Sequence, residues 1–168
     1  MSDKLQQCHL IGAGRAGSAL AQAMTKVGYQ FTWVGSRNAE SAEKLAKLIG
    51  TEEWWTDFRD IQEVDGFLII AIPDDKIKMV AATIRDAGVI KPGRTVIAHL
   101  RGALGSNVLE SLRGAGASGM AFHPCQTLTP ESDSDKVFRG ICFDMEGDAA
   151  ACEIGARVAI DLGAVSVV

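Results

Sequence analysis

A glycine-rich turn near the N-terminus constrains the fold more than any other feature of this sequence. It has the sequence Gly12-Ala13-Gly14-Arg15-Ala16-Gly17, directly after the apolar segment 7–11. With this spacing, the first glycine permits a tight turn, the second lets the backbone approach a pyrophosphate, and the third lets a helix pack against a strand. The free N–H groups of the helix that follows favour a phosphate. We therefore predict that this turn, from Gly12 to Gly17, binds a dinucleotide; a glycine turn without a ligand is the alternative.

Apolar segments of two kinds alternate along the rest of the chain. Short continuous runs predict strands at residues 7–11, 31–34, 54–55, 67–72, 95–99, 120–122, 141–143 and 164–168. Apolar residues spaced by three and four predict helices over 16–27, 42–49, 77–84, 108–112 and 151–162. Such alternation is typical of a doubly wound, mostly parallel α/β sheet, the Rossmann fold, here as one domain over residues 1–168. Segment 127–139 is expected to be a surface loop within that domain.

Polar residues mark where several of these helices should begin. Asn38 is placed to cap the second helix, and Asp74 or Asp75 to cap the third. Ser106 and Asn107 are expected to be helix caps, and Asn107 with Glu110 has the spacing of a capping box. These expectations rest on local spacing alone.

Composition excludes several classes of protein. The 168 residues are 47% hydrophobic and carry a formal charge of −4, with no basic stripe, so we expect no nucleic-acid partner. The longest apolar run, Phe67–Pro73, is far shorter than the roughly 20 residues that span a membrane, so no membrane partner is expected. No secretory signal pattern is present.

The cysteines point to a reducing compartment. Cys8, Cys125, Cys142 and Cys152 include no Cys-x-x-Cys pair, and their spacing matches neither a metal site nor a disulfide framework. We therefore predict no metal, reduced thiols and a cytoplasmic protein. Cys125 has no activating neighbour in the sequence and is expected to be a small apolar filler.

The residues after the second predicted strand indicate which dinucleotide binds. An NAD site usually has Asp or Glu there, whereas this chain has Gly35-Ser36-Arg37-Asn38. Arg37 can pair with a 2′-phosphate, and Ser36 can donate a hydrogen bond to it. We therefore predict NADP(H) as the cofactor. The alternative is that Arg37 is a solvated loop residue and that Ser36 or Asn38 only caps the helix.

Polar residues also follow the later strands, where ligands of open α/β sheets bind. Ala71-Ile72-Pro73 is expected beside the nicotinamide. His99 is the first candidate to protonate a reacting oxygen or nitrogen, and His123 the second. Arg101 is a candidate to hold a substrate carboxylate. A structural hydrogen-bonding role remains the alternative for either histidine.

Four stretches together resemble a known group of enzymes. They are His9–Gly17, Ala71–Asp74, His99–Leu104 and His123–Thr127. In these stretches the chain resembles NADP-dependent oxidoreductases related to pyrroline-5-carboxylate reductase and the 6-phosphogluconate dehydrogenases. The closest resemblance is to a subgroup of predicted oxidoreductases with a Rossmann-like N-terminal domain and a helical C-terminal domain. The resemblance implies NADPH, a small C=O or C=N substrate and a homodimer.

Two departures from the group change the expectation. Arg101 replaces a small hydroxyl residue, which suggests a more anionic substrate. The group's helical domain, which supplies dimer contacts and part of the substrate site, would begin after Val168. We therefore expect an NADPH-dependent oxidoreductase, or its cofactor domain, that is catalytically incomplete as this chain alone. A non-catalytic NADP(H)-binding sensor or partner module is the alternative function.

Overall fold

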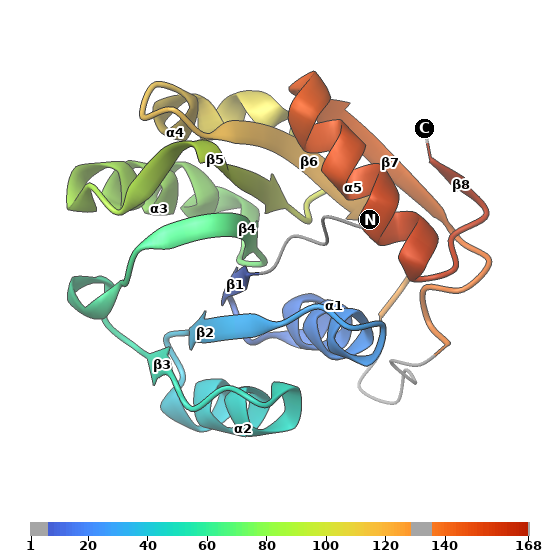
Figure 1. Ribbon diagram of the computed structural model, residues 1–168, viewed down its shortest axis with the longest axis horizontal. Helices are drawn as coiled ribbons and strands as arrows, with labels where there is room; N and C mark the ends of the chain where they lie inside the picture. Colours follow the sequence, from blue (N-terminus) through green and yellow to red (C-terminus); the bar gives the residue numbers. More distant parts are fainter. Residues whose placement is uncertain (1–6, 129–135, 168) are drawn as a thin grey trace.

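One sheet organises the computed structural model, which describes residues 7–128 and 136–167 (Figure 1). In chain order its elements are β1 Cys8–Ile11, α1 Arg15–Lys26, β2 Phe31–Gly35, α2 Ala39–Ile49, β3 Trp54–Trp55, η1 Phe58–Asp60, β4 Val64–Ile70, α3 Asp74–Ala87, β5 Ile90–His99, η2 Ser106–Leu109, α4 Glu110–Arg113, β6 Ser118–Pro124, β7 Cys142–Gly147, α5 Ala149–Asp161 and β8 Ser166–Val167. Strands and helices alternate as far as β6, as the hydrophobic pattern predicts.

The strand order is β3-β2-β1-β4-β5-β6-β7-β8. The pairings from β3 to β6 are all parallel, β7 is antiparallel to β6, and β8 is parallel to β7. The order reverses at β1, because the chain moves outward to β2 and β3 and then returns to β4 on the other side. This arrangement confirms the predicted doubly wound, mostly parallel Rossmann fold, and it places the switch point between β1 and β4.

The central strand β4 shows why the interior is stable. Phe67, Leu68, Ile69 and Ile70 are all fully buried. Phe67 and Ile69 pack into one apolar cluster, and Leu68 and Ile70 into another on the opposite face. A continuous apolar run is therefore what a parallel strand covered on both faces requires.

Helices cover both faces of the sheet. Helices α1, α2 and α5 lie on one side of it, and α3 and α4 lie on the other (Figure 1). The predicted inner faces of α2 and α3 are confirmed, since all eight residues are buried: Ala42, Leu45, Ala46, Ile49, Ile77, Val80, Ala81 and Ile84.

Helix starts are predicted correctly in only one of the three cases. The Asn38 side chain accepts a hydrogen bond from the Ser41 N–H at 2.8 Å, so Asn38 caps α2 as expected. Helix α3 is different, because Pro73 occupies the cap position and Asp74 and Asp75 lie in the first turn. Carboxylates there still favour the positive end of the helix dipole.

The predicted capping box is wrong. Residues 106–109 form a 3-10 turn that precedes the short helix α4, and neither has a side-chain cap. The Ser106 N–H and hydroxyl instead donate to the Glu146 carboxylate on β7, at 2.6 and 2.8 Å. A partner 40 residues away in sequence replaces the local cap, which no spacing rule would reveal.

Two expectations about the C-terminal third also need correction. Of the predicted surface loop 127–139, residues 129–135 lie outside the described part of the chain. Phe138 is not on the surface but buried against Phe143, with ring centroids 6.0 Å apart. Cys125 is exposed rather than an apolar filler.

Candidate functional site

The glycine turn borders a cavity of about 510 Å³ at the switch point of the sheet. Segments that follow β1, β2, β3 and β4 meet there, together with the first turns of α3. The lining residues are Ile11, Gly12, Ala13, Gly14, Gly35, Ser36, Arg37, Asn38, Ser41, Trp55, Thr56, Phe58, Ala71, Ile72, Pro73, Lys76, Met79 and Val80. The structure therefore brings together the glycine turn, the Ser36–Arg37 segment and Ala71–Pro73, as the sequence predicts.

The three glycines of the turn have different surroundings. Gly12 has a φ of +107°, and a Cβ there would lie 2.1 Å from the Ala71 carbonyl oxygen. A Cβ on Gly17 would lie 2.1 Å from the Gly12 carbonyl oxygen. A Cβ on Gly14 would have no atom within 4 Å. Gly12 and Gly17 are thus required for packing, whereas Gly14 leaves open space beside the cavity.

The start of α1 offers unpaired donors next to Gly14. Gly14 occupies the N-cap position and supplies no side-chain cap, and no acidic residue lies in the first turn. The first-turn N–H groups of a helix have no partner within the helix, so those of Arg15 and Ala16 are available to an anion. The Arg15 side chain is exposed.

The end of β2 presents a hydroxyl and a guanidinium to the same cavity. Asn38 takes the capping role, so neither Ser36 nor Arg37 is needed for it. Ser36 lines the cavity, and its N–H donates to the Trp55 carbonyl at 3.0 Å. Its hydroxyl has no hydrogen-bond partner among the described residues. Arg37 is exposed and pairs with no carboxylate of the described chain.

Sequence reasoning missed the opposite wall of this cavity. Thr56 and Phe58 follow β3, and Lys76 and Met79 project from α3. The predicted strand at 54–55 contained a usable signal, since a parallel strand beside β2 ends at the same edge of the sheet. The α3 pattern indicates only which side faces the core, so it does not predict that Lys76 reaches the cavity.

His99 does not face a cleft. Its side chain is fully buried, its Nε2 lies 3.2 Å from the Gly105 carbonyl oxygen, and its Nδ1 accepts from the Arg101 N–H at 3.3 Å. Burial lowers the pKa of His99 below its usual value, although the Gly105 contact and nearby carboxylates oppose the shift. Both ring nitrogens of His99 hold the loop after β5 in this structure, which favours the structural hydrogen-bonding alternative over the role of proton donor.

Arg101 is also engaged. Its guanidinium pairs with the Asp74 carboxylate, which joins the loop after β5 to the first turn of α3. Because this partner already compensates the charge, a substrate carboxylate would compete with Asp74 for Arg101.

His123 is better placed for chemistry than His99. It lines a smaller cavity of about 220 Å³ together with Arg101, Asp144 and Glu146. Its Nδ1 lies 3.1 Å from the Leu100 carbonyl oxygen, which can only accept, so Nδ1 carries the proton in this contact. Nε2 has no hydrogen-bond partner among the described residues. His123 can therefore exchange a proton at Nε2.

Hydrogen bonds hold the far wall of this smaller cavity. The Ser106 N–H and hydroxyl hold the pKa of Glu146 below its usual value. Ser106 Oγ in turn accepts from Arg113 at 2.8 Å, and Arg113 donates to Asp148 at 2.8 Å. The network ties the segment that follows the His99 loop to β7.

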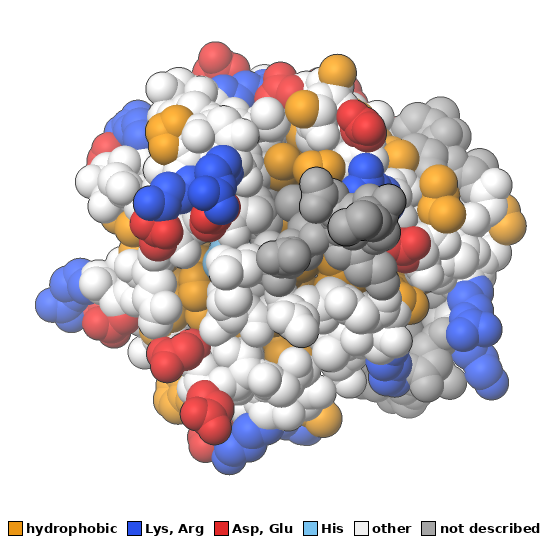
Figure 2. Space-filling model, in the orientation of Figure 1, with side chains coloured by type: hydrophobic (Ala, Val, Ile, Leu, Met, Phe, Trp, Pro, Cys, Tyr) orange, Lys and Arg blue, Asp and Glu red, His pale blue; other side chains and the backbone are white. Residues whose placement is uncertain are grey.

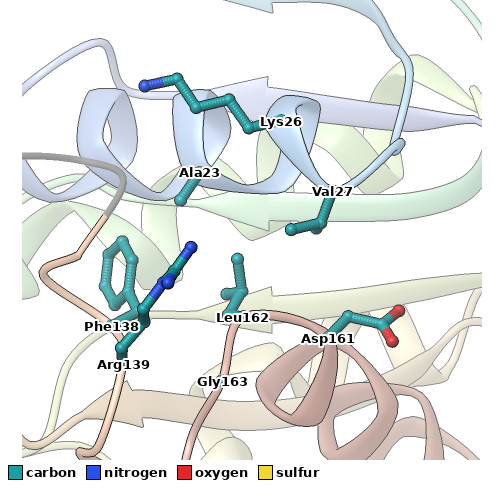
Figure 3. Close-up of a pocket in the computed structure, with 8 residues that line it drawn as sticks. All are labelled: Ala23, Lys26, Val27, Phe138, Arg139, Asp161, Leu162 and Gly163. Carbon is teal, nitrogen blue, oxygen red and sulfur yellow. The ribbon is translucent and has the colours of Figure 1, made fainter.

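A further cavity, of about 430 Å³, lies elsewhere (Figure 3). It is formed by the C-terminal half of α1, the end of α5 and the Phe138–Arg139 segment. Lys26 and Asp161 at its rim point in opposite directions (Figure 3). Because α1 starts at the glycine turn and ends at this cavity, the two sites lie at opposite ends of the helix.

Charges of both signs are interspersed over the face in Figure 2. No cluster of three His, Cys, Asp or Glu side chains in residues 7–128 and 136–167 could hold a metal ion. None of the helices in those ranges is long and apolar enough to cross a membrane.

Comparisons with known proteins agree on the fold. A family model described as the Rossmann-like domain matches residues 2–124. A candidate NADP oxidoreductase from Bacteroides fragilis is 26% identical and superposes with a TM-score of 0.83, over 97% of this chain and 60% of that one. Prephenate dehydrogenase from Aquifex aeolicus is 17% identical, with a TM-score of 0.76, over 96% of this chain and 60% of that one.

Pyrroline-5-carboxylate reductase from Coxiella burnetii is 15% identical, with a TM-score of 0.69, over 98% of this chain and 59% of that one. This chain therefore spans about 60% of the length of these solved proteins. Among curated proteins, the sequence has no match.

The buried histidines predict how stability depends on pH. Burial lowers the folded-state pKa of both His9 and His99 below the usual 6.5. The unfolded chain therefore binds more protons as pH falls below 6.5, and stability is lost until the folded pKa is reached. Urea denaturation between about pH 7.5 and 5.5 should show decreasing stability, with a shallower decrease in His99→Gln. Stability that is unchanged or rises in the parent would contradict this account.

Proposed function

The chain belongs to the Rossmann-like domain family, and from this premise we propose that it binds NADP(H) and serves hydride transfer to a small C=O or C=N compound. The observation that carries the proposal is the open space at Gly14 beside the cavity at the switch point. The backbone is exposed there next to the unpaired donors of α1, which is the arrangement that a bound pyrophosphate requires.

The charges of the cavity favour a polyanion. Arg37 and Lys76 are its ionisable lining residues in the described chain, and both are cationic. Lys76 also contacts Asp75 at 3.1 Å, but that carboxylate does not line the cavity. With no carboxylate at the end of β2, nothing there repels a 2′-phosphate, and Ser36 and Arg37 supply donors for it. These features support NADP(H) over NAD(H).

Other residues of this chain are assigned to the nicotinamide side of the cavity and to proton transfer. Ala71, Ile72 and Pro73 form an apolar wall of the cavity on the side of β4. His123 exchanges a proton at Nε2 with the oxygen or nitrogen of a small molecule in the smaller cavity, which it lines. NADPH supplies the hydride when bound. The names of two solved relatives, an NADP oxidoreductase and a pyrroline-5-carboxylate reductase, support this class of reaction.

We predict that the protein binds NADPH more tightly than NADH. A hydrogen bond to a charged group contributes about 1.5–3 kcal/mol, which corresponds to roughly 10- to 150-fold in affinity. Fluorescence titration with both reduced cofactors measures the ratio. Arg37→Asp should reverse the preference, because it adds repulsion as well as removing attraction. Arg139→Asp, at the distant cavity, is the matched control and should keep it. Equal affinities in the parent would refute the NADP assignment.

A second prediction separates the glycines that serve the fold from the one that serves the ligand. Gly14→Val should abolish NADPH binding while leaving circular dichroism and the melting temperature unchanged, because its Cβ meets open space. Gly17→Val should lower the melting temperature, because its Cβ would meet the Gly12 carbonyl. If Gly14→Val binds NADPH like the parent, the cavity is not the pyrophosphate site.

Hydride transfer is tested separately from binding. NADPH consumption is measured with a panel of small keto acids and cyclic imines, and at least one compound should raise it above background, although only slightly, as the sequence predicts for this chain alone. His123→Ala should then lower the rate by roughly 10²- to 10⁴-fold, the usual contribution of a general acid. NADPH affinity should not change, since His123 does not line the larger cavity. Tight NADPH binding with no consumption by any compound would favour a sensor or partner module instead.

A further inference from the structure

Two cysteines lie opposite each other where β6 and β7 meet. The antiparallel register pairs His123 with Asp144 and Pro124 with Phe143. The next pair in that register is Cys125 and Cys142. The Cys125 N–H donates to the Cys142 carbonyl oxygen at 2.9 Å, so the antiparallel pairing extends to this pair.

The Cα separation expected for this pair is within the range of a covalent cross-link. Residues that oppose each other in a hydrogen-bonded antiparallel pair have Cα atoms about 5.5 Å apart and side chains on the same face. Disulfides form across Cα separations of about 4.4–6.8 Å. Desolvation, and after it the neighbouring Cys142 side chain, raise the pKa of the Cys125 thiol above its usual value. The Cys125 thiol donates to the His123 carbonyl oxygen at 3.9 Å. Both thiols are free in this structure.

We propose that Cys125 and Cys142 form a dithiol site that is oxidised to an intramolecular disulfide by low-molecular-weight disulfides. Exposure sets the order of events, because Cys125 is exposed and Cys142 is half-buried. The other two cysteines lie elsewhere: Cys8 is fully buried in β1, and Cys152 lies on α5.

The reaction balances with one oxidant molecule. The Cys125 thiolate attacks one sulfur of the oxidant, forms a mixed disulfide and releases one thiolate. The Cys142 thiolate then attacks the Cys125 sulfur, closes the protein disulfide and releases the second thiolate. The two protons lost by the cysteines are taken up by the released thiolates. The protein loses two electrons, and the oxidant is reduced to two thiols.

The site lies beside the wall of the smaller cavity. Cys125 follows His123 by two residues, and Cys142 precedes Asp144 by two, so the cross-link would join the strand ends that carry both cavity residues. Exposed disulfides have the more oxidising potentials that characterise labile, reversible bonds. Formation of this disulfide does not require a bound cofactor, because neither cysteine lines the larger cavity.

Oxidised glutathione is the probe that tests this proposal on the whole protein. The four thiols of the parent, counted after denaturation, should fall to two, and digestion should yield a peptide pair linked through Cys125 and Cys142. Dithiothreitol should restore all four. Cys142→Ser should stop at a mixed disulfide on Cys125. Cys152→Ser is the matched control and should still close the bond.

Three results would overturn the proposal. One is a parent protein that retains glutathione on Cys125 while the Cys142 thiol remains free. Another is a disulfide between two chains rather than within one. The third is loss of the intramolecular bond in Cys152→Ser, which would show that α5 supplies the second sulfur.

Discussion

The close approach of the segments that follow β1 and β4 governs how the neighbouring helices leave the sheet. The Ala71 N–H donates to the Ile11 carbonyl at 2.7 Å, and Gly12 passes so near the Ala71 carbonyl that no side chain fits between them. Because the strand order reverses at this pair, helices α1 and α3 leave the sheet on opposite faces. The space between their first turns becomes the cavity. The packing of Gly12 against Ala71 therefore has two effects. It sets the directions of α1 and α3, and it leaves the backbone of the glycine turn exposed beside the cavity.

Side chains that suggest catalysis in the sequence instead anchor the loop after β5. His99 holds the loop after β5 with both ring nitrogens, Arg101 ties that loop to Asp74, and Ser106 ties the next segment to Glu146. Buried polar groups require partners, so a histidine at a strand end is often used for positioning rather than for proton transfer. On the neighbouring strand, His123 is held at Nδ1 by the Leu100 carbonyl oxygen, and its Nε2 has no hydrogen-bond partner within residues 7–128 and 136–167.

The Arg101–Asp74 pair also changes the charge that the sequence predicts for the smaller cavity. Arg101 in the sequence suggests an anionic substrate, but its charge is compensated by Asp74. Asp144 and Glu146 come from β7, which lies beside β6 only because the sheet turns antiparallel there. The neighbours of His123 are therefore set by the pairing of β6 with β7, which places His123 opposite Asp144, a residue distant from it in the sequence.

Local sequence pattern is enough to predict most strands and helices, the inner faces of α2 and α3, the Asn38 cap and the glycine turn between strand and helix. These features depend on residues within one or two turns of each other, where periodicity and turn chemistry act. Contacts between distant elements bury His99, pair Arg101 with Asp74, bring Phe138 into the core and place Lys76 at the cavity. Each depends on strand register and on which distant element covers which face. A one-residue change of register would turn every side chain of a strand to the other face, so local pattern cannot specify these contacts.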